Sequence, residues 1–139
     1  MSDQDQVLKA SGKFYAALNS MVKGDAGPMA DAWSHAADVT AMHPIGGRQV
    51  GWDEVIGSFR QVAELSSGGS VRVMDQLIRV VGDVAYELGV EQGNVKLAGT
   101  DVSIDHRVTN TYRKEGGAWK LVHHHTDTSP AMMKVLENL

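Results

Sequence analysis

The stretch that decides the fold is DVSIDHRVTNTYRKEGGAWKLVHHHTD, residues 101–127. Two runs rich in Val, Ile, Thr and Tyr flank Gly116-Gly117, which is typical of a β-hairpin with two central turn residues. Such a turn pairs Tyr112 with Leu121 in an antiparallel ladder. The stretch therefore predicts two long paired strands.

Continuing this ladder places Thr109 opposite His124 and Arg107 opposite Thr126, which separates two faces. The first face is largely apolar and consists of Val102, Ile104, His106, Val108, Asn110, Tyr112, Trp119, Leu121, His123, His125 and Asp127. The second face is polar and consists of Asp105, Arg107, Thr109, Thr111, Val122, His124 and Thr126. A three-residue turn would instead bring His123 and His125 beside Arg107 and Thr109, so both arrangements remain open.

Upstream of the hairpin, the sequence changes from helical to strand periodicity. Apolar residues recur at three- and four-residue steps over residues 7–21, 29–37 and 52–63, which predicts three helices. A short strand is predicted at 39–43, ended by Pro44 and a Gly46-Gly47 turn. Longer strands are predicted at about 71–81, 84–92, 95–113 and 118–127, with turns at Gly82-Asp83 and Gly93-Asn94, and residues 130–139 favour a terminal helix.

Three helices followed by an antiparallel meander predict an α+β fold, with the helices packed on one face of a curved, mostly antiparallel sheet. We expect residues 1–139 to form a single domain, because domains of about 100–150 residues are the commonest. Three helices can cover only one side of such a sheet. The apolar face is therefore predicted to form a homodimer through the outer side of the sheet, and the polar face to line a cavity beneath the helices.

Composition excludes several functional classes. The chain has 13 Lys and Arg against 17 Asp and Glu, a net charge of -4 and no cysteine. An acidic chain without a basic cluster argues against nucleic acid or membrane as a partner, and the absence of cysteine excludes disulfides and thiolate chemistry. No signal peptide or membrane span is recognisable, so a cytoplasmic location is expected. The remaining partners are a small organic ligand and a second copy of the chain.

Three segments together resemble one superfamily of cone-shaped domains. They are Phe14-Tyr15-Ala16-Ala17-Leu18-Asn19, Met42-His43-Pro44-Ile45-Gly46, and the run from Arg107-Val108-Thr109 through Gly116-Gly117-Ala118-Trp119-Lys120-Leu121-Val122 to His123-His124-His125. The sequence resembles the nuclear transport factor 2-like superfamily, which includes ketosteroid isomerase, scytalone dehydratase and SnoaL-like polyketide cyclases. The ending is most similar to the SnoaL-like group and to kinase association domains. The resemblance covers nearly the whole chain and implies a cone-shaped fold.

The resemblance also implies roles for individual positions. Ketosteroid isomerases place their catalytic base at the position of His43, their oxyanion tyrosine at Phe14 and a protonated aspartic acid at about Thr109. Two of those hydrogen-bond donors are replaced here, which argues against steroid isomerisation. SnoaL-like cyclases carry a catalytic aspartate at the position of His124, and kinase association domains carry arginines near Thr109 or Asn110 and near Thr126. These equivalences favour the two-residue turn.

His43 and His124 are the candidate general bases, because an imidazole with a pKa of about 6.5 accepts a proton at neutral pH. Arg107 is the candidate oxyanion stabiliser, since its planar guanidinium binds carbonyl and carboxylate oxygens. Alternatively, His43 caps a strand end, and the polar ladder of His124 and Arg107 is a solvated surface.

The remaining candidates fall into two groups. Cavity-lining residues are predicted to be Phe14, Tyr15, Trp33, Trp52, Phe59, Thr109, Val122 and Thr126, and interface residues Tyr112, Trp119, Leu121, His123 and His125. His123 and His125, with His106 and Asp127, could form a two-histidine, one-carboxylate metal set, but cross-subunit hydrogen bonds are favoured over it. We therefore expect neither a metal nor a cofactor.

The function expected from the sequence is small-molecule binding in a hydrophobic cavity. Its chemistry would be proton transfer next to a carbonyl, as in an isomerase, cyclase or dehydratase. The alternative is a non-catalytic ligand-binding or assembly module whose sheet face supplies the function.

Overall fold

A computed structural model describes residues 1–139. Its elements in chain order are α1 (Asp3–Met21), α2 (Met29–Ala32), β1 (Thr40–His43), β2 (Gly46–Val50), α3 (Trp52–Leu65), β3 (Ser66–Val81), β4 (Val84–Leu97), β5 (Thr100–Glu115), β6 (Ala118–Thr126) and α4 (Pro130–Glu137). The predicted α+β fold with three N-terminal helices is confirmed, as is the terminal helix. No helix combines the length and hydropathy needed to span a membrane.

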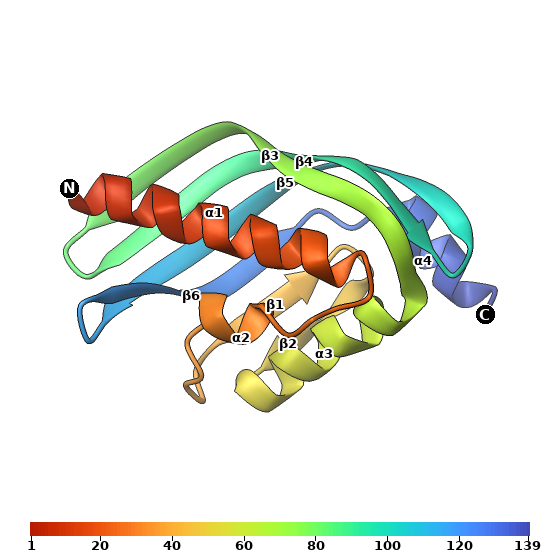
Figure 1. The fold of residues 1–139 in the computed structure, drawn as a ribbon, viewed down its shortest axis with the longest axis horizontal. Coiled ribbons are helices and arrows are strands. Elements are labelled where there is room, and N and C mark those ends of the chain that lie inside the picture. The colour runs from red at the N-terminus through yellow and green to blue at the C-terminus, as the bar shows by residue number, and fades with distance from the viewer.

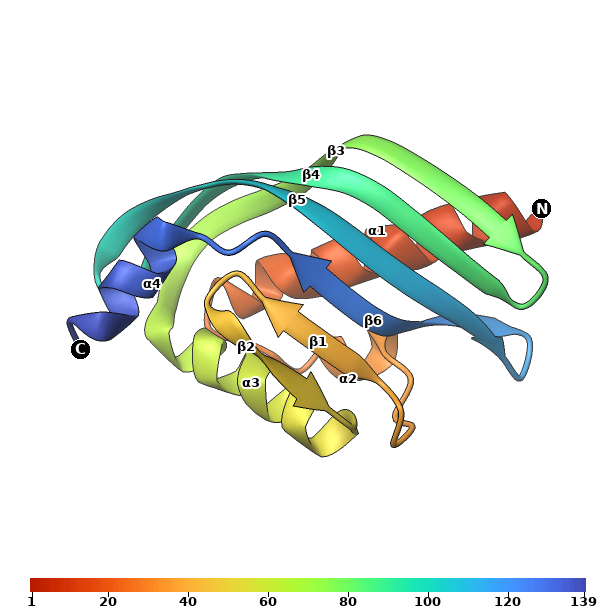
Figure 2. The same cartoon turned by 180° about the vertical axis from the view of Figure 1, so that it is seen from behind.

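The strands form one strongly curved sheet in the order β2-β1-β6-β5-β4-β3. Every neighbouring pair is antiparallel except β1 and β6, which run parallel. The curve of the sheet wraps around α1, with α2 and α3 below it and α4 at the end opposite the N-terminus (Figure 1). The view from behind shows β1 and β2 beside β6 (Figure 2). The face of the sheet toward α1 is called the inner face below, and the opposite one the outer face.

Local sequence signals explain where the helices begin. Ser2 caps α1, since its hydroxyl accepts a hydrogen bond from the Asp5 N–H at 3.1 Å and the Asp5 carboxylate accepts one from the Ser2 N–H at 3.2 Å. Ser129 caps α4 through its hydroxyl alone, which accepts a hydrogen bond from the Met132 N–H at 3.2 Å, and Pro130 lies in the first helical turn. These caps fix the first turns of the two helices.

Two predicted turns are wrong. Gly46-Gly47 lie within β2, after a turn at Pro44-Ile45. The second wrong turn is at Gly93-Asn94. The strand β4 runs through both residues and turns at Ala98-Gly99 instead. A Cβ atom on Gly93 would lie 1.9 Å from the Ser70 carbonyl oxygen, so glycine is required there for β3 to approach β4. This glycine therefore serves a close strand approach rather than a turn.

The hairpin of β5 and β6 contains a β-bulge that the sequence analysis missed. The two-residue turn at Gly116-Gly117 and the pair of Tyr112 with Leu121 are as predicted, but Thr111 pairs with His123, leaving Val122 as the extra residue. Beyond the bulge, His124 pairs with Asn110 and shares its face. His123 and His125 therefore lie on the face of Arg107 and Thr109, as in the second predicted arrangement, but the bulge and not a three-residue turn changes the parity of β6.

The predicted orientation of the sheet is also wrong. Tyr112, Trp119 and Leu121 were expected at the outer interface, yet they are buried under the helices. Burial of apolar surface is the dominant favourable contribution to folding, so the apolar side of β5 faces the helices. Consequently Arg107, Thr109 and Thr111 lie on the outer face.

Candidate functional site

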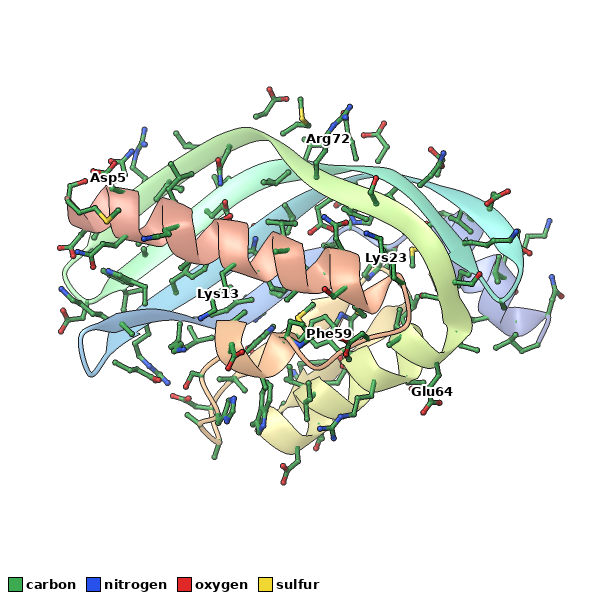
Figure 3. The ribbon with its side chains drawn as sticks, in the orientation of Figure 1. Asp5, Lys13, Lys23, Phe59, Glu64 and Arg72 are labelled. Carbon is green, nitrogen blue, oxygen red and sulfur yellow. The ribbon has the colours of Figure 1, made fainter.

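A small cavity lies between the inner face of the sheet and the helices α1, α3 and α4. Its free volume is about 60 Å³, room for a few water molecules. Its wall is mostly apolar, with Leu18, Met21, Phe59, Val62, Ile104 and Met132 among the lining residues. Phe59 points from α3 into the space beneath α1, whereas Glu64 on the same helix points to solvent (Figure 3). The polar part of the wall consists of His43, Glu91, His106 and His124.

His43 ends β1 and lies against Phe59, with ring centroids 4.8 Å apart. Its Nε2 lies 2.8 Å from the Ser58 hydroxyl, which itself donates to the Val55 carbonyl at 2.6 Å. Burial, with a smaller contribution from the charge of His124, lowers the pKa of His43 from 6.5 to about 3. His43 is therefore neutral at physiological pH.

His124 reaches the cavity because of the bulge at Val122. Its ring lies 5.0 Å from the Phe14 ring and 6.2 Å from the His43 ring, measured between centroids. Its Nδ1 lies 2.6 Å from the Asn110 side-chain oxygen. Burial lowers the pKa of His124 below 6.5, so two neutral imidazoles face one cavity.

Glu91 forms the third polar part of the wall. Its carboxylate accepts hydrogen bonds from His106 Nε2 at 2.8 Å and from the Tyr15 hydroxyl at 2.9 Å. Burial raises the pKa of Glu91, but the hydrogen bonds from His106 and Tyr15 are among the effects that outweigh it and lower the pKa below its ordinary value. Burial raises the pKa of Tyr15 far above 10, so its phenol keeps the proton that it donates.

Glu87 lies four residues earlier on the same face of β4 and is fully buried. Its carboxylate accepts hydrogen bonds from Ser11 at 2.6 Å, Tyr112 at 2.8 Å and Asn110 at 2.9 Å, and a fourth from Gln76. Asn110 also donates to the Tyr15 hydroxyl at 3.1 Å. One network thus joins the two glutamates and His124.

Arg107 does not face the cavity. Its side chain is 82% exposed on the outer face and forms a bidentate ion pair with Asp127, at 2.9 and 3.0 Å. This hydrogen bonding raises the pKa of Arg107 and lowers that of Asp127 to about 2. Thr109 lies on the same outer face, opposite His125. The predicted ladder of His124, Arg107 and Thr109 is therefore not formed.

The other predicted lining residues have different environments. Phe14 and Trp33 are buried and pack against Phe59, with ring centroids 6.5 and 5.8 Å from it. Trp52 instead stacks on His35, with centroids 4.1 Å apart. Thr126 is buried, and its hydroxyl has no hydrogen-bond partner. Of the eight predicted lining residues, the cavity wall itself includes Phe59, and Phe14, Tyr15 and Trp33 contact wall residues.

The predicted metal set is not brought together. His123 and His125 lie on the outer face, with ring centroids 5.9 Å apart, whereas His106 points inward to Glu91. Because of the bulge in β6, His123 and His125 lie on the outer face of the sheet, opposite to His106 on the inner face. The structure contains no group of three or more His, Asp or Glu side chains that could hold a metal ion.

Sequence reasoning missed Glu87, Glu91 and Asn110. In β4 the residues Tyr86, Leu88 and Val90 alternate with the glutamates, a pattern that ordinarily places the apolar side inward. The structure reverses this, because donors from α1, β3 and β5 satisfy both carboxylates. The sequence offers only weak signals of this reversal, namely Gly89 and Gly93 on either side of Glu91 and Tyr15 in the first helix.

The curved sheet wrapped around one long helix and the internal cavity define the nuclear transport factor 2-like class. Residues 7–132 match the SnoaL-like domain family. The chain therefore belongs to the SnoaL-like domain family within the nuclear transport factor 2-like superfamily. A search of curated proteins found no match.

Solved structures agree with this assignment. A proposed dehydratase of the same superfamily from Streptomyces avermitilis is 26% identical, with a TM-score of 0.79 over 91% of this chain and 96% of its own. A proposed calcium/calmodulin-dependent protein kinase type II association domain from Thiobacillus denitrificans is 23% identical, with a TM-score of 0.68 over 86% of this chain and 92% of its own. The CaMKII hub of S. rosetta is 19% identical, with a TM-score of 0.69 over 93% and 98%. The last two show the fold alone.

Proposed function

We propose that this chain binds a small organic molecule in the cavity and transfers a proton within it. His124 is the base, and His43 lies beside it on the same cavity wall. The observation that carries this proposal is the pair of neutral imidazoles, 6.2 Å apart between ring centroids, on the wall of one apolar cavity. A neutral imidazole can accept a proton directly, whereas a protonated one cannot.

A dehydration illustrates the chemistry, and the name of the Streptomyces avermitilis protein favours it. His124 Nε2 takes the proton from the carbon next to a carbonyl, and that electron pair forms a carbon–carbon double bond. The bond from the neighbouring carbon to its hydroxyl group breaks, and the imidazolium returns the proton so that water leaves. Isomerisation and cyclisation begin with the same proton abstraction. Arg107 has no part in this proposal, because it lies outside the cavity.

The test is proton exchange with solvent deuterium at the carbon next to the carbonyl, measured over a panel of ketones and polyketides. The variants His124→Ala and His43→Ala should lose at least about a hundredfold in rate on any compound that the protein turns over, as expected for a general base. His125→Ala is the matched control, because this neighbour lies on the outer face. Equal exchange rates in all four proteins would refute the catalytic proposal.

We further propose that two copies associate through the outer face, the assembly alternative of the sequence analysis. Apolar side chains on this face of β3 and β4 are 39–69% exposed; they are Met74, Leu77, Val81, Val84, Tyr86 and Leu88. Such a contiguous patch is typical of an association surface. The names of the kinase association domain and hub structures also favour assembly.

Light scattering at micromolar concentration tests the association. We expect a dimer for the unmodified chain and a monomer for Leu88→Arg, since two buried arginines would face each other across a two-fold interface. Leu8→Arg is the control, because Leu8 is 49% exposed on α1. A monomer for the unmodified chain, or a dimer unaffected by Leu88→Arg, would refute this interface.

A further inference from the structure

Each histidine on the cavity wall has one ring nitrogen hydrogen-bonded to another protein group. The lining residues include no Ser, Thr, Tyr, Lys or Arg. The polar members are three histidines and one carboxylate, and their hydrogen bonds determine what each can offer a ligand.

His43 offers a lone pair. The Ser58 hydroxyl has one hydrogen, which it donates to the Val55 carbonyl, so it must accept from His43 Nε2. The Nε2 therefore carries the proton of the neutral ring, and Nδ1 is left as an acceptor. No hydrogen bond engages this Nδ1 in the structure.

His124 offers a lone pair for a similar reason. The Asn110 amide nitrogen donates to the Glu87 carboxylate at 2.9 Å, which turns the Asn110 oxygen toward His124. The Nδ1 of His124 must then be the donor, and its Nε2 is left as a free acceptor. Glu87 thereby fixes the tautomer of His124 through Asn110.

Glu91 completes the set. Its two oxygens accept one hydrogen bond each, from His106 and Tyr15, and a carboxylate oxygen has room for two. The Tyr15 hydroxyl and the His106 Nε2–H both donate to this carboxylate, so neither hydrogen is free for a ligand. The wall thus combines two neutral nitrogen acceptors with a carboxylate.

We propose that the ligand of this cavity is an uncharged molecule whose polar end donates hydrogen bonds, such as a phenol, an enol or a hydroxy ketone. This inference rests on the proposed function, because it takes the same cavity as the site. A hydroxyl group satisfies the free acceptors of His43 or His124, whereas an ether of the same shape leaves them unpaired. A carboxylate ligand finds no donor on His43 or His124 and is repelled by Glu91, so anions are disfavoured.

Three benzene derivatives that differ in one polar group test the inference: phenol, its methyl ether anisole, and benzoate. Each is titrated into the protein while the imidazole ring signals of its histidines are followed by NMR. The variant Met132→Ala is titrated in parallel, because removing this side chain from the wall enlarges a cavity of about 60 Å³. We expect phenol to shift the His43 and His124 signals and to bind at least about tenfold more tightly than anisole. Benzoate should shift neither signal.

The possible results separate this inference from the proposed function. Anisole binding as tightly as phenol, or benzoate shifting the two cavity signals, would overturn the inference and leave the cavity as the site. Phenol shifting the outer-face His125 signal but neither cavity signal would overturn the proposed site itself. No shift with phenol in either form of the protein would also overturn the inference, because Met132→Ala provides the space.

Discussion

Two glutamates on one face of β4 show how differently a protein can use a buried carboxylate. Glu87 is enclosed by four donors and touches no cavity, whereas Glu91 has two donors and lies on the cavity wall. Burial of a charge is thus a poor sign of function on its own. The unused acceptor capacity beside a cavity is what distinguishes the Glu91 end of the network from the sealed Glu87 end.

Removing Glu87 should have the largest effect on stability. The variant Glu87→Ala leaves the buried hydroxyls of Ser11 and Tyr112 without an acceptor and removes one acceptor each from Asn110 and Gln76, and we expect the free energy of unfolding to fall by about 3–5 kcal/mol. Urea denaturation measures the change. Glu64→Ala, at an exposed position on α3, is the control and should change stability by less than about 0.5 kcal/mol. A loss below about 1 kcal/mol for Glu87→Ala would contradict the sealed network.

Acidification should lower the free energy of unfolding through the buried histidine His43 on the cavity wall. The pKa of His43 is lower in the folded chain, at about 3, than its ordinary value of 6.5, so protons bind the unfolded chain more tightly between these values. The stability that neutral His43 contributes is therefore fully present above pH 6.5 and is lost as the pH falls from there toward 3. Between pH 7 and pH 5 we expect a loss of about 2 kcal/mol from His43.

The control for the pH effect is His43→Gln, whose amide can still donate to Ser58. This variant should lose about 2 kcal/mol less than the unmodified chain between pH 7 and pH 5, measured by urea denaturation at both values. If the two proteins lose the same stability, His43 does not titrate as the buried neutral group described above.

The smallest expected effect concerns the partner that fixes the tautomer of His43. Ser58→Ala removes the acceptor of the Nε2 hydrogen and should cost about 1 kcal/mol. Ser67→Ala, at an exposed position of β3, should be neutral. Thermal unfolding of the two variants compares them, and an equal melting temperature would show that Ser58 does not hold His43.

Much of the fold could be predicted from the sequence because its signals are local. The Gly116-Gly117 turn has positive φ at both residues, 56° and 81°, as a two-residue hairpin requires. The apolar stripe of Trp52 to Ala63 likewise predicted α3. Such patterns depend on neighbours within a few positions, so a single sequence contains them.

The candidate site was less predictable because it depends on contacts between distant segments. One extra residue, Val122, moves His124 to the inner face and His125 to the outer one, and no local pattern marks this bulge. Glu87 is buried only because Ser11, 76 positions away in the chain, donates to it together with residues of β3 and β5. His43 and His124 were predicted as bases, and the structure brings both to the cavity, whereas Arg107 lies on the opposite side of the sheet.

The most direct test of this account is nitrogen NMR of the protein with ¹⁵N-labelled histidine at pH 7. We predict two neutral rings of opposite tautomer in the cavity, His43 with its proton on Nε2 and His124 with its proton on Nδ1. Addition of phenol should perturb the unprotonated nitrogen of at least one of them. A protonated ring at either position, or the reverse tautomers, would contradict the description of the cavity as a wall of acceptors.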